Sequence, residues 1–175
     1  MNEKRDVGAQ VLAWWRTSLS ARTQSENEDE RASRASQTAA RALSAKLRRG
    51  VFPAVLFEPE TQGLRKQLGL RDNELKRFSY LLNLLGEIRE HDPRPLAELL
   101  RGTGSEPVLS HMRFRQLVTA DDDKRAALLR RAVRLVGGRC NVARLAWDMI
   151  VWNEQTRIRW CLDYFDASIS EGKAG

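Results

Sequence analysis

The stretch that decides the fold begins at Asp121 and reads DDDKRAALLRRAVRLVGG through Gly138. On a helical wheel of about 100° per residue, one side holds Leu128, Leu129, Ala132, Val133, Leu135 and Val136. Arg130, Arg131 and Arg134 lie apart from them. The three leading aspartates suit an N-cap and first turn, because acidic side chains there complement the helix dipole. We therefore predict a helix with one apolar face toward a core and one arginine face toward solvent.

The segment after this helix, Asn141–Trp152, is predicted to be a buried helix. Apolar residues cover almost every side of it, so both Trp147 and Trp152 are expected in the core. Its two charged residues, Arg144 and Asp148, are four positions apart, and we expect them to pair on the one edge that meets solvent.

A last helix, over residues 154–167, is predicted to complete a three-helix core. Its core-facing side is expected to consist of Ile158, Cys161, Leu162 and Phe165. Arginines then coat the outside of the three helices.

The remainder of the chain shows helical spacing of apolar residues, without a convincing alternation of period two. The predicted helices cover 7–18, 26–49, 61–68, 73–89, 96–101 and 109–118. The predicted fold is all-α, a compact helical bundle in two packed halves with no sheet. The linker-like stretch Gly102–Pro107 places the boundary, which gives halves 1–105 and 106–167, and a polar tail at 168–175 is expected to be disordered.

The net charge of +7 over 175 residues is concentrated in the second half. From His111 to Arg144 there are nine Lys or Arg and three Asp, a net of +6, whereas residues 1–45 hold seven basic and six acidic groups. A basic stretch of this kind indicates a site for a polyanion, most often nucleic acid, although a solvated arginine-rich surface is the plainer alternative.

No motif for catalysis or cofactor binding stands out. The chain has neither a nucleotide-binding glycine loop nor a His-Glu-x-x-His motif, and His91 and His111 stand alone. Cys140 and Cys161 are too far apart for a zinc site or a disulfide framework. We therefore expect no enzyme activity, no catalytic residue, no metal and no cofactor. The sequence shows neither a signal peptide nor a membrane-spanning run, so we expect a soluble, cytoplasmic protein without membrane contact.

With these segments in place, the chain resembles the small subunit (CasB family) of the type I-E CRISPR Cascade surveillance complex. The resemblance spans most of the chain and rests on the order and spacing of several short motifs. They include Trp14, Leu47-Arg48-Arg49, the helix Leu96–Leu100, Arg113-Phe114-Arg115, Leu129–Leu135, Val142–Ala146 with Trp152, and Asp163-x-Phe165. The poorest match is Ser20–Glu60, where this chain has a long charged insert.

The resemblance implies an all-helical, non-enzymatic subunit of an antiviral ribonucleoprotein. Its implied partners are DNA (the target duplex and the displaced single strand), the other Cascade subunits with their guide RNA, and a second copy of itself. Basic faces would steer the DNA during R-loop formation. The residues expected to bind nucleic acid are Lys46, Arg48, Arg49, Arg113, Arg115, Arg130, Arg131, Arg134 and Arg139.

Two other classes of protein fit parts of the sequence. One is a helix-turn-helix regulator built from residues 124–152, although its second helix shows only Arg144 and Asp148 as charged residues for reading base edges. The other is a scaffold whose arginines bind acidic protein partners. Lys46–Arg49 is equally compatible with an ordinary helix end, because basic residues suit a helix C-terminus.

Overall fold

The structure is a computed structural model that describes residues 2–20 and 30–166, with side chains over 6–20 and 32–166. The predicted tail at 168–175 lies outside these residues. The all-α prediction is confirmed: within the described residues the extended pairing is a parallel pair of two-residue strands.

The helices of the N-terminal part are α1 (Asn2–Ser18), α2 (Glu30–Arg49), α3 (Pro59–Leu68) and α4 (Leu75–Glu87), with 3-10 turns η2 (Ala54–Phe57) and η3 (Asp72–Glu74). The C-terminal part holds α5 (Leu96–Arg101), α6 (His111–Thr119), α7 (Asp122–Leu135), α8 (Val142–Ile150) and α9 (Glu154–Asp166), and the strands are β1 (Glu90–His91) and β2 (Arg139–Cys140).

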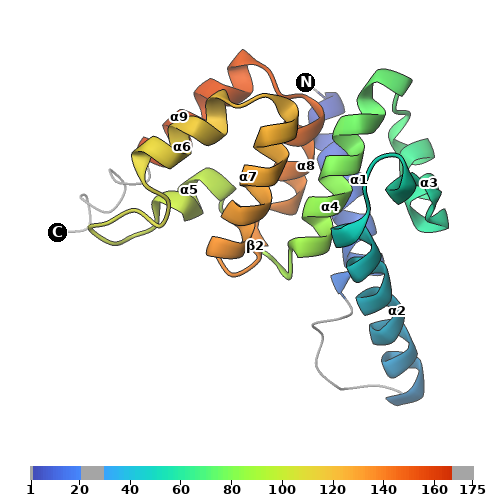
Figure 1. Cartoon of the computed structure of the whole chain (residues 1–175). Coiled ribbons are helices and arrows are strands. Elements are labelled where there is room, and N and C mark those ends of the chain that lie inside the picture. Colours follow the sequence, from blue (N-terminus) through green and yellow to red (C-terminus); the bar gives the residue numbers. More distant parts are fainter. Residues whose placement is uncertain (1, 21–29, 167–175) are drawn as a thin grey trace.

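Helix α4 lies at the centre of the molecule, between the N-terminal and C-terminal helices (Figure 1). It contacts α2 on one side and both α7 and α8 on the other, while α1 packs along α8. Helices α5, α6 and α9 lie at the far end from α2 and α3 (Figure 1). Because β1 directly follows α4 and pairs with β2 directly after α7, the two helices end beside each other.

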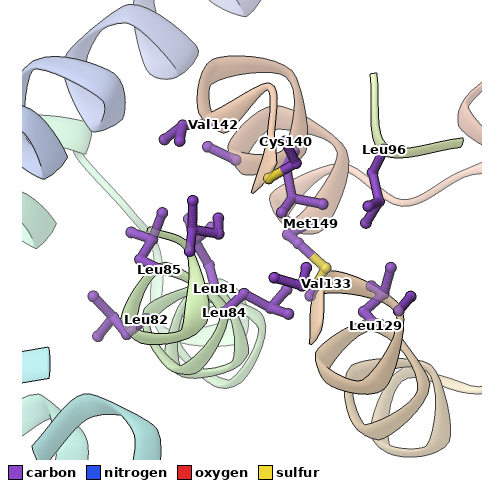
Figure 2. Packing of buried hydrophobic residues seen from close by; sticks show 14 of the residues in the cluster. Leu81, Leu82, Leu84, Leu85, Leu96, Leu129, Val133, Cys140, Val142 and Met149 are labelled. Atoms are coloured by element: carbon purple, nitrogen blue, oxygen red, sulfur yellow. The ribbon is translucent and has the colours of Figure 1, made fainter. Parts of the chain in front are cut away.

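One continuous apolar core joins these helices. Leucines of α4 meet Leu129 and Val133 of α7 and residues of α8, and in Figure 2 the Met149 side chain of α8 points toward Val133. A helix that is apolar on most sides can only be stable when other helices cover it, which is the position of α4 and α8. The core draws on both predicted halves, and their division near residue 105 stays a prediction.

Two glycines allow the closest helix contacts. A Cβ added at Gly8 of α1 would lie 2.6 Å from the Ala143 carbonyl oxygen of α8, and one at Gly86 of α4 would lie 3.0 Å from Cγ of Arg48 in α2. The first distance leaves no room for a Cβ and the second is tighter than nearly all real Cβ contacts, so these positions allow α1 to approach α8, and α2 to approach α4, closely.

The predicted surface pair Arg144–Asp148 is wrong. Asp148 is only 2% exposed, and its carboxylate accepts hydrogen bonds from the Trp160 indole at 2.8 Å and from Arg159 at 2.5 Å. Burial raises the pKa of Asp148, although Trp160 and Arg159 act in the opposite direction. Arg144 pairs with Asp163 of α9 instead.

The predicted core face of α9 is also wrong. Its buried residues are Thr156, Trp160 and Tyr164, whereas Ile158, Leu162 and Phe165 are 46%, 53% and 49% exposed and Cys161 is half-buried. Tyr164 is fully buried, stacks on Phe114 and donates a hydrogen bond to the Leu109 carbonyl. Two faces of α9 carry apolar residues. The face with Trp160 and Tyr164 turns toward the core, where both side chains find hydrogen-bond partners.

Smaller corrections concern α4 and α8. The helix expected from residue 73 begins at Leu75, because Asp72–Glu74 forms the 3-10 turn η3. Trp152 is buried as predicted, at 7% exposure, and stacks edge-on against Trp160, but Trp147 is only half-buried. In the part of the chain with described coordinates, no helix is long and apolar enough to cross a bilayer.

Candidate nucleic-acid interface

An arginine-lined cavity of about 680 Å³ opens where α2, α4 and α7 come together. Five arginines and, among the described side chains, a single carboxylate line it: Arg48, Arg49, Arg89, Arg130, Arg134 and Glu87. The glycine turn after α7 completes the wall. Five positive charges against one negative charge leave a net of four, so the cavity attracts anions. We call it the arginine cavity.

The end of α2 is fixed by hydrogen bonds with α4. The Asn83 amide donates hydrogen bonds to the carbonyls of Leu47 at 2.6 Å and Gly50 at 2.8 Å, which satisfies carbonyls that a helix end leaves without partners. Ser44 donates to the Gly86 carbonyl at 2.9 Å. These bonds and the missing side chain at Gly86 place Arg48 and Arg49 at the rim of the cavity.

Glu87, at the end of α4, binds two arginines of α7. Its side chain is 7% exposed and accepts hydrogen bonds from Arg130 at 2.7 Å and Arg134 at 2.5 Å. Burial would raise the pKa of Glu87, but the hydrogen bonds from Arg134 and Arg130 prevail and lower it. Arg130 also donates to the Arg48 carbonyl at 2.7 Å, so this arginine joins all three helices.

The turn Gly137–Gly138 brings Arg89 to the same cavity. Both glycines have positive φ, 71° and 76°, a conformation that favours glycine. The Gly138 carbonyl accepts hydrogen bonds from the amides of Arg89 at 2.8 Å and Glu90 at 3.2 Å, which holds the start of β1 against the end of α7. Neither Arg89 nor Glu87 is among the residues that the sequence predicts for the site, because each joins it only through the contact between the end of α7 and the end of α4.

The arginines of the cavity differ in how their charge is used. Arg48, Arg49 and Arg89 make no side-chain hydrogen bond or ion pair with any residue whose side chain the structure describes. Arg130 and Arg134 are held by Glu87, yet their side chains are still 30% and 58% exposed. Three charges are therefore available to a ligand, and two more are positioned beside them.

A second hollow, between α6 and α7, adjoins the arginine cavity. This groove has a volume of about 580 Å³, and its basic residues are Arg113, Arg131 and Arg134. Arg134 lines both hollows, so the basic surface continues from one to the other. On the opposite side, Arg49 also lines a small hollow with Lys46, whose ammonium pairs with Glu58 at 2.8 Å. The arginines thus follow one another from the end of α2, across α7, to α6, and we call this line the basic track.

Two of the predicted residues lie apart from the basic track. Arg139 on β2 pairs with Asp92 at 2.9 Å, and the pKa of Asp92 is strongly lowered, first by Arg94 and also by Arg139. Arg115 lines neither hollow. At about 100° per residue it lies about 160° around α6 from Arg113, on nearly the opposite side of the helix. The structure therefore gathers Arg48, Arg49, Arg113, Arg130, Arg131 and Arg134 and leaves these two outside. Lys46 lies beside Arg49 in the small hollow but is paired with Glu58.

The acidic run at the start of α7 caps the helix and pairs with basic side chains of α4 and α7. Asp121 accepts a hydrogen bond from the Lys124 amide, as the predicted N-cap. Asp122 binds Arg77 and Arg125, and Asp123 binds Lys76. Over residues 2–20 and 30–166, no group of three or more His, Cys, Asp or Glu side chains is arranged to hold a metal ion.

Comparison with known proteins identifies the family. The family model of the CRISPR-associated protein Cse2 matches residues 2–165. The chain belongs to the Cse2 family. A curated Cse2 protein from Thermus thermophilus is 35% identical over 106 residues, which cover 56% of this chain and 62% of that protein. The aligned part thus spans less than two thirds of that Cse2 relative.

Solved structures agree with membership of the Cse2 family over a longer span. The crystal structure of a Cse2-family protein from T. thermophilus matches with a TM-score of 0.64 and 27% identity, covering 90% of this chain and 97% of that chain. A second crystal structure, of CasB from T. thermophilus, matches with a TM-score of 0.62, 26% identity and the same coverage. A chain of E. coli Cascade bound to a PAM-containing double-stranded DNA target has a TM-score of 0.55, 20% identity and the same coverage, which shows the fold alone.

Proposed function

We propose that this Cse2-family chain is the non-catalytic small subunit of a type I-E CRISPR Cascade ribonucleoprotein. In this role it binds DNA without sequence preference through the basic track and stabilises the displaced strand of the R-loop. One observation carries the proposal: arginines from α2, α7 and the segment just after α4 converge on one cavity, whose described lining includes a single carboxylate.

The chemistry of the basic track suits a phosphate backbone. Guanidinium groups bind phosphate oxygens, which are the same at every nucleotide, so contacts of this kind position DNA without reading its sequence. Opening a duplex to pair with a guide RNA is nearly balanced in free energy, because one set of base pairs replaces another. A protein surface that holds the displaced strand therefore shifts the equilibrium toward the open R-loop.

The proposed partners follow from the family and its structural relatives. The E. coli chain that shares this fold comes from a Cascade bound to double-stranded DNA. For the present chain we propose the same kind of assembly, with other Cascade subunits, their guide RNA and a second copy of itself. Exposed Ile158, Leu162 and Phe165 on α9 provide an apolar surface suited to contact with a protein subunit.

The helix-turn-helix alternative has little support. Its second helix, α8, packs along α1 and against α4, and most of its residues are buried. A recognition helix must present polar side chains to base edges in the major groove. In α8, Asp148 is buried and Arg144 is paired with Asp163, so neither charged side chain of this helix is available to read base edges.

Salt-dependent binding to single-stranded oligonucleotides tests the proposal. If the track neutralises about four to six phosphates, log affinity should fall against log salt with a slope of roughly −3 to −4. Replacing Arg49, Arg89 and Arg131 with glutamine should flatten the slope by up to ~2 and weaken binding equally for unrelated sequences. The first two have no described side-chain partner and Arg131 is exposed, so the fold should remain stable.

A charge-matched variant provides the control. Replacing Lys66, Arg71 and Arg157 with glutamine removes the same three charges from exposed positions outside both hollows. This variant should keep a slope close to that of the unaltered chain. Equal losses in the two variants would mean that net charge alone binds DNA, and no loss in either would favour the scaffold interpretation.

A further inference from the structure

We propose that the groove between α6 and α7 binds unpaired nucleobases of the strand whose phosphates follow the basic track. This inference rests on the proposed DNA-binding function and adds to it a place for the bases. The groove would therefore distinguish a single strand, whose bases are accessible, from a duplex, whose bases are stacked inside.

The groove combines apolar walls with a basic rim. Leu117 and Leu128 line it, and Leu135, at the last turn of α7, is 53% exposed beside them. Arg113 and Arg131 are exposed on either side, one from each helix. Among the residues that the structure describes around this groove there is no acidic side chain.

This combination suits a nucleotide better than a purely apolar or a purely anionic ligand. An unpaired base has apolar faces that stack on apolar side chains and on guanidinium planes. Its phosphate carries a negative charge, which the arginines of the rim complement. A volume of about 580 Å³ lies within the roughly 300–1,000 Å³ that small-molecule sites occupy, so a base fits with room for its sugar.

Continuity with the arginine cavity decides between occupants. Arg134 lines both hollows, so a strand whose phosphates occupy the cavity passes directly along the groove. An apolar protein helix in the groove would instead bury the arginine rim without any compensating charge. The apolar residues Ile158, Leu162 and Phe165 of α9 line neither hollow, so a substitution there serves as a control for the groove.

The test compares an intact oligo-dT with an abasic strand of equal length, which has the same phosphates but no bases. The unaltered chain should bind the intact strand about five- to tenfold more tightly, the lower end of the range for stacked bases. Leu135→Ala and Leu135→Gln should bring the two affinities together while leaving abasic binding and its salt slope unchanged. Leu162→Ala, at the equally exposed leucine of α9, should behave like the unaltered chain.

The possible outcomes separate this inference from the proposed function. Equal affinity of the unaltered chain for intact and abasic strands would overturn base binding in the groove, while a steep salt slope on both would still support the phosphate track. Salt-independent binding of the abasic strand would instead overturn the track. If Leu162→Ala lowers the intact-strand affinity as Leu135→Ala does, the effect does not come from the groove.

Discussion

Replacing Glu87 with glutamine should tighten DNA binding and weaken the fold at the same time. Glu87 is the only carboxylate among the side chains described around the arginine cavity, and it occupies two of the five arginines. Glutamine has the same shape but no charge. The cavity would therefore gain one net positive charge, while Arg130 and Arg134 would lose their charged partner.

The two effects can be estimated separately. A phosphate about 6 Å from the Glu87 carboxylate is repelled by roughly 0.7–2.8 kcal/mol, depending on the local dielectric, so removing the charge should tighten binding about three- to a hundredfold in low salt. Breaking a fully buried ion pair costs about 3–5 kcal/mol. Because Arg130 and Arg134 are 30% and 58% exposed, solvent screening lowers the expected cost to about 1–2 kcal/mol of unfolding free energy.

Denaturant melts and oligonucleotide titrations on one preparation measure both effects. Asp92→Asn is a matched control, because Asp92 is also buried and also bridges two arginines, Arg94 and Arg139, outside the arginine cavity. It should destabilise the fold without tightening DNA binding. If Glu87→Gln binds DNA no better than the unaltered chain while remaining folded, the cavity is not where the phosphates bind.

Two further predictions concern the fold. Gly8→Ala should destabilise the protein by about 1–3 kcal/mol, because its Cβ would clash with the Ala143 carbonyl, whereas Gly63→Ala in α3 meets open space and should be neutral or stabilising in a thermal melt. The pKa values of Glu87 and Asp92 are lowered in the fold, so the stability that each adds is present above its unfolded pKa and is lost as pH falls through its folded pKa. In an acid titration of unfolding, either amide variant should therefore lose stability less steeply than the unaltered chain as the pH falls. Equally steep losses would contradict the assignment.

The helices themselves were predictable, because their signals are local. The predicted apolar face of α7 is confirmed in part, because Leu129, Ala132 and Val133 are buried but Leu135 is 53% exposed. Asp121 caps that helix as its position predicts. The short helix Leu96–Arg101 after two prolines also has the predicted bounds. In each case the periodicity and the terminal residues lie within one element.

The face of α9 was not predictable, because two of its sides are apolar. Ile158 and Leu162 lie on one side, and Trp160 and Tyr164 on another, so helical spacing alone cannot choose. The choice depends on hydrogen-bond partners from other parts of the chain: Asp148 of α8 accepts from Trp160, and the Leu109 carbonyl accepts from Tyr164. Asp148 was misplaced at the surface for the same reason.

The site was predictable only in part. The arginines of α7 stood out, because their shared face is visible in the sequence. Glu87 and Arg89 did not, since their contacts with α7 and the turn after it cross more than 40 positions of the chain. Arg139 was included for its charge, although the structure pairs it with Asp92. A charge count predicts a basic surface but not which of its charges other residues neutralise.

Crosslinking from defined positions tests the central claim most directly. A photo-activated benzoylphenylalanine at position 89 or 131 should crosslink to single-stranded DNA of any sequence, because both positions lie on the basic track. The same group at position 157 on α9, an exposed arginine outside both hollows, should give little product. Equal yields from positions 89, 131 and 157, or product from position 157 alone, would contradict DNA binding along the basic track.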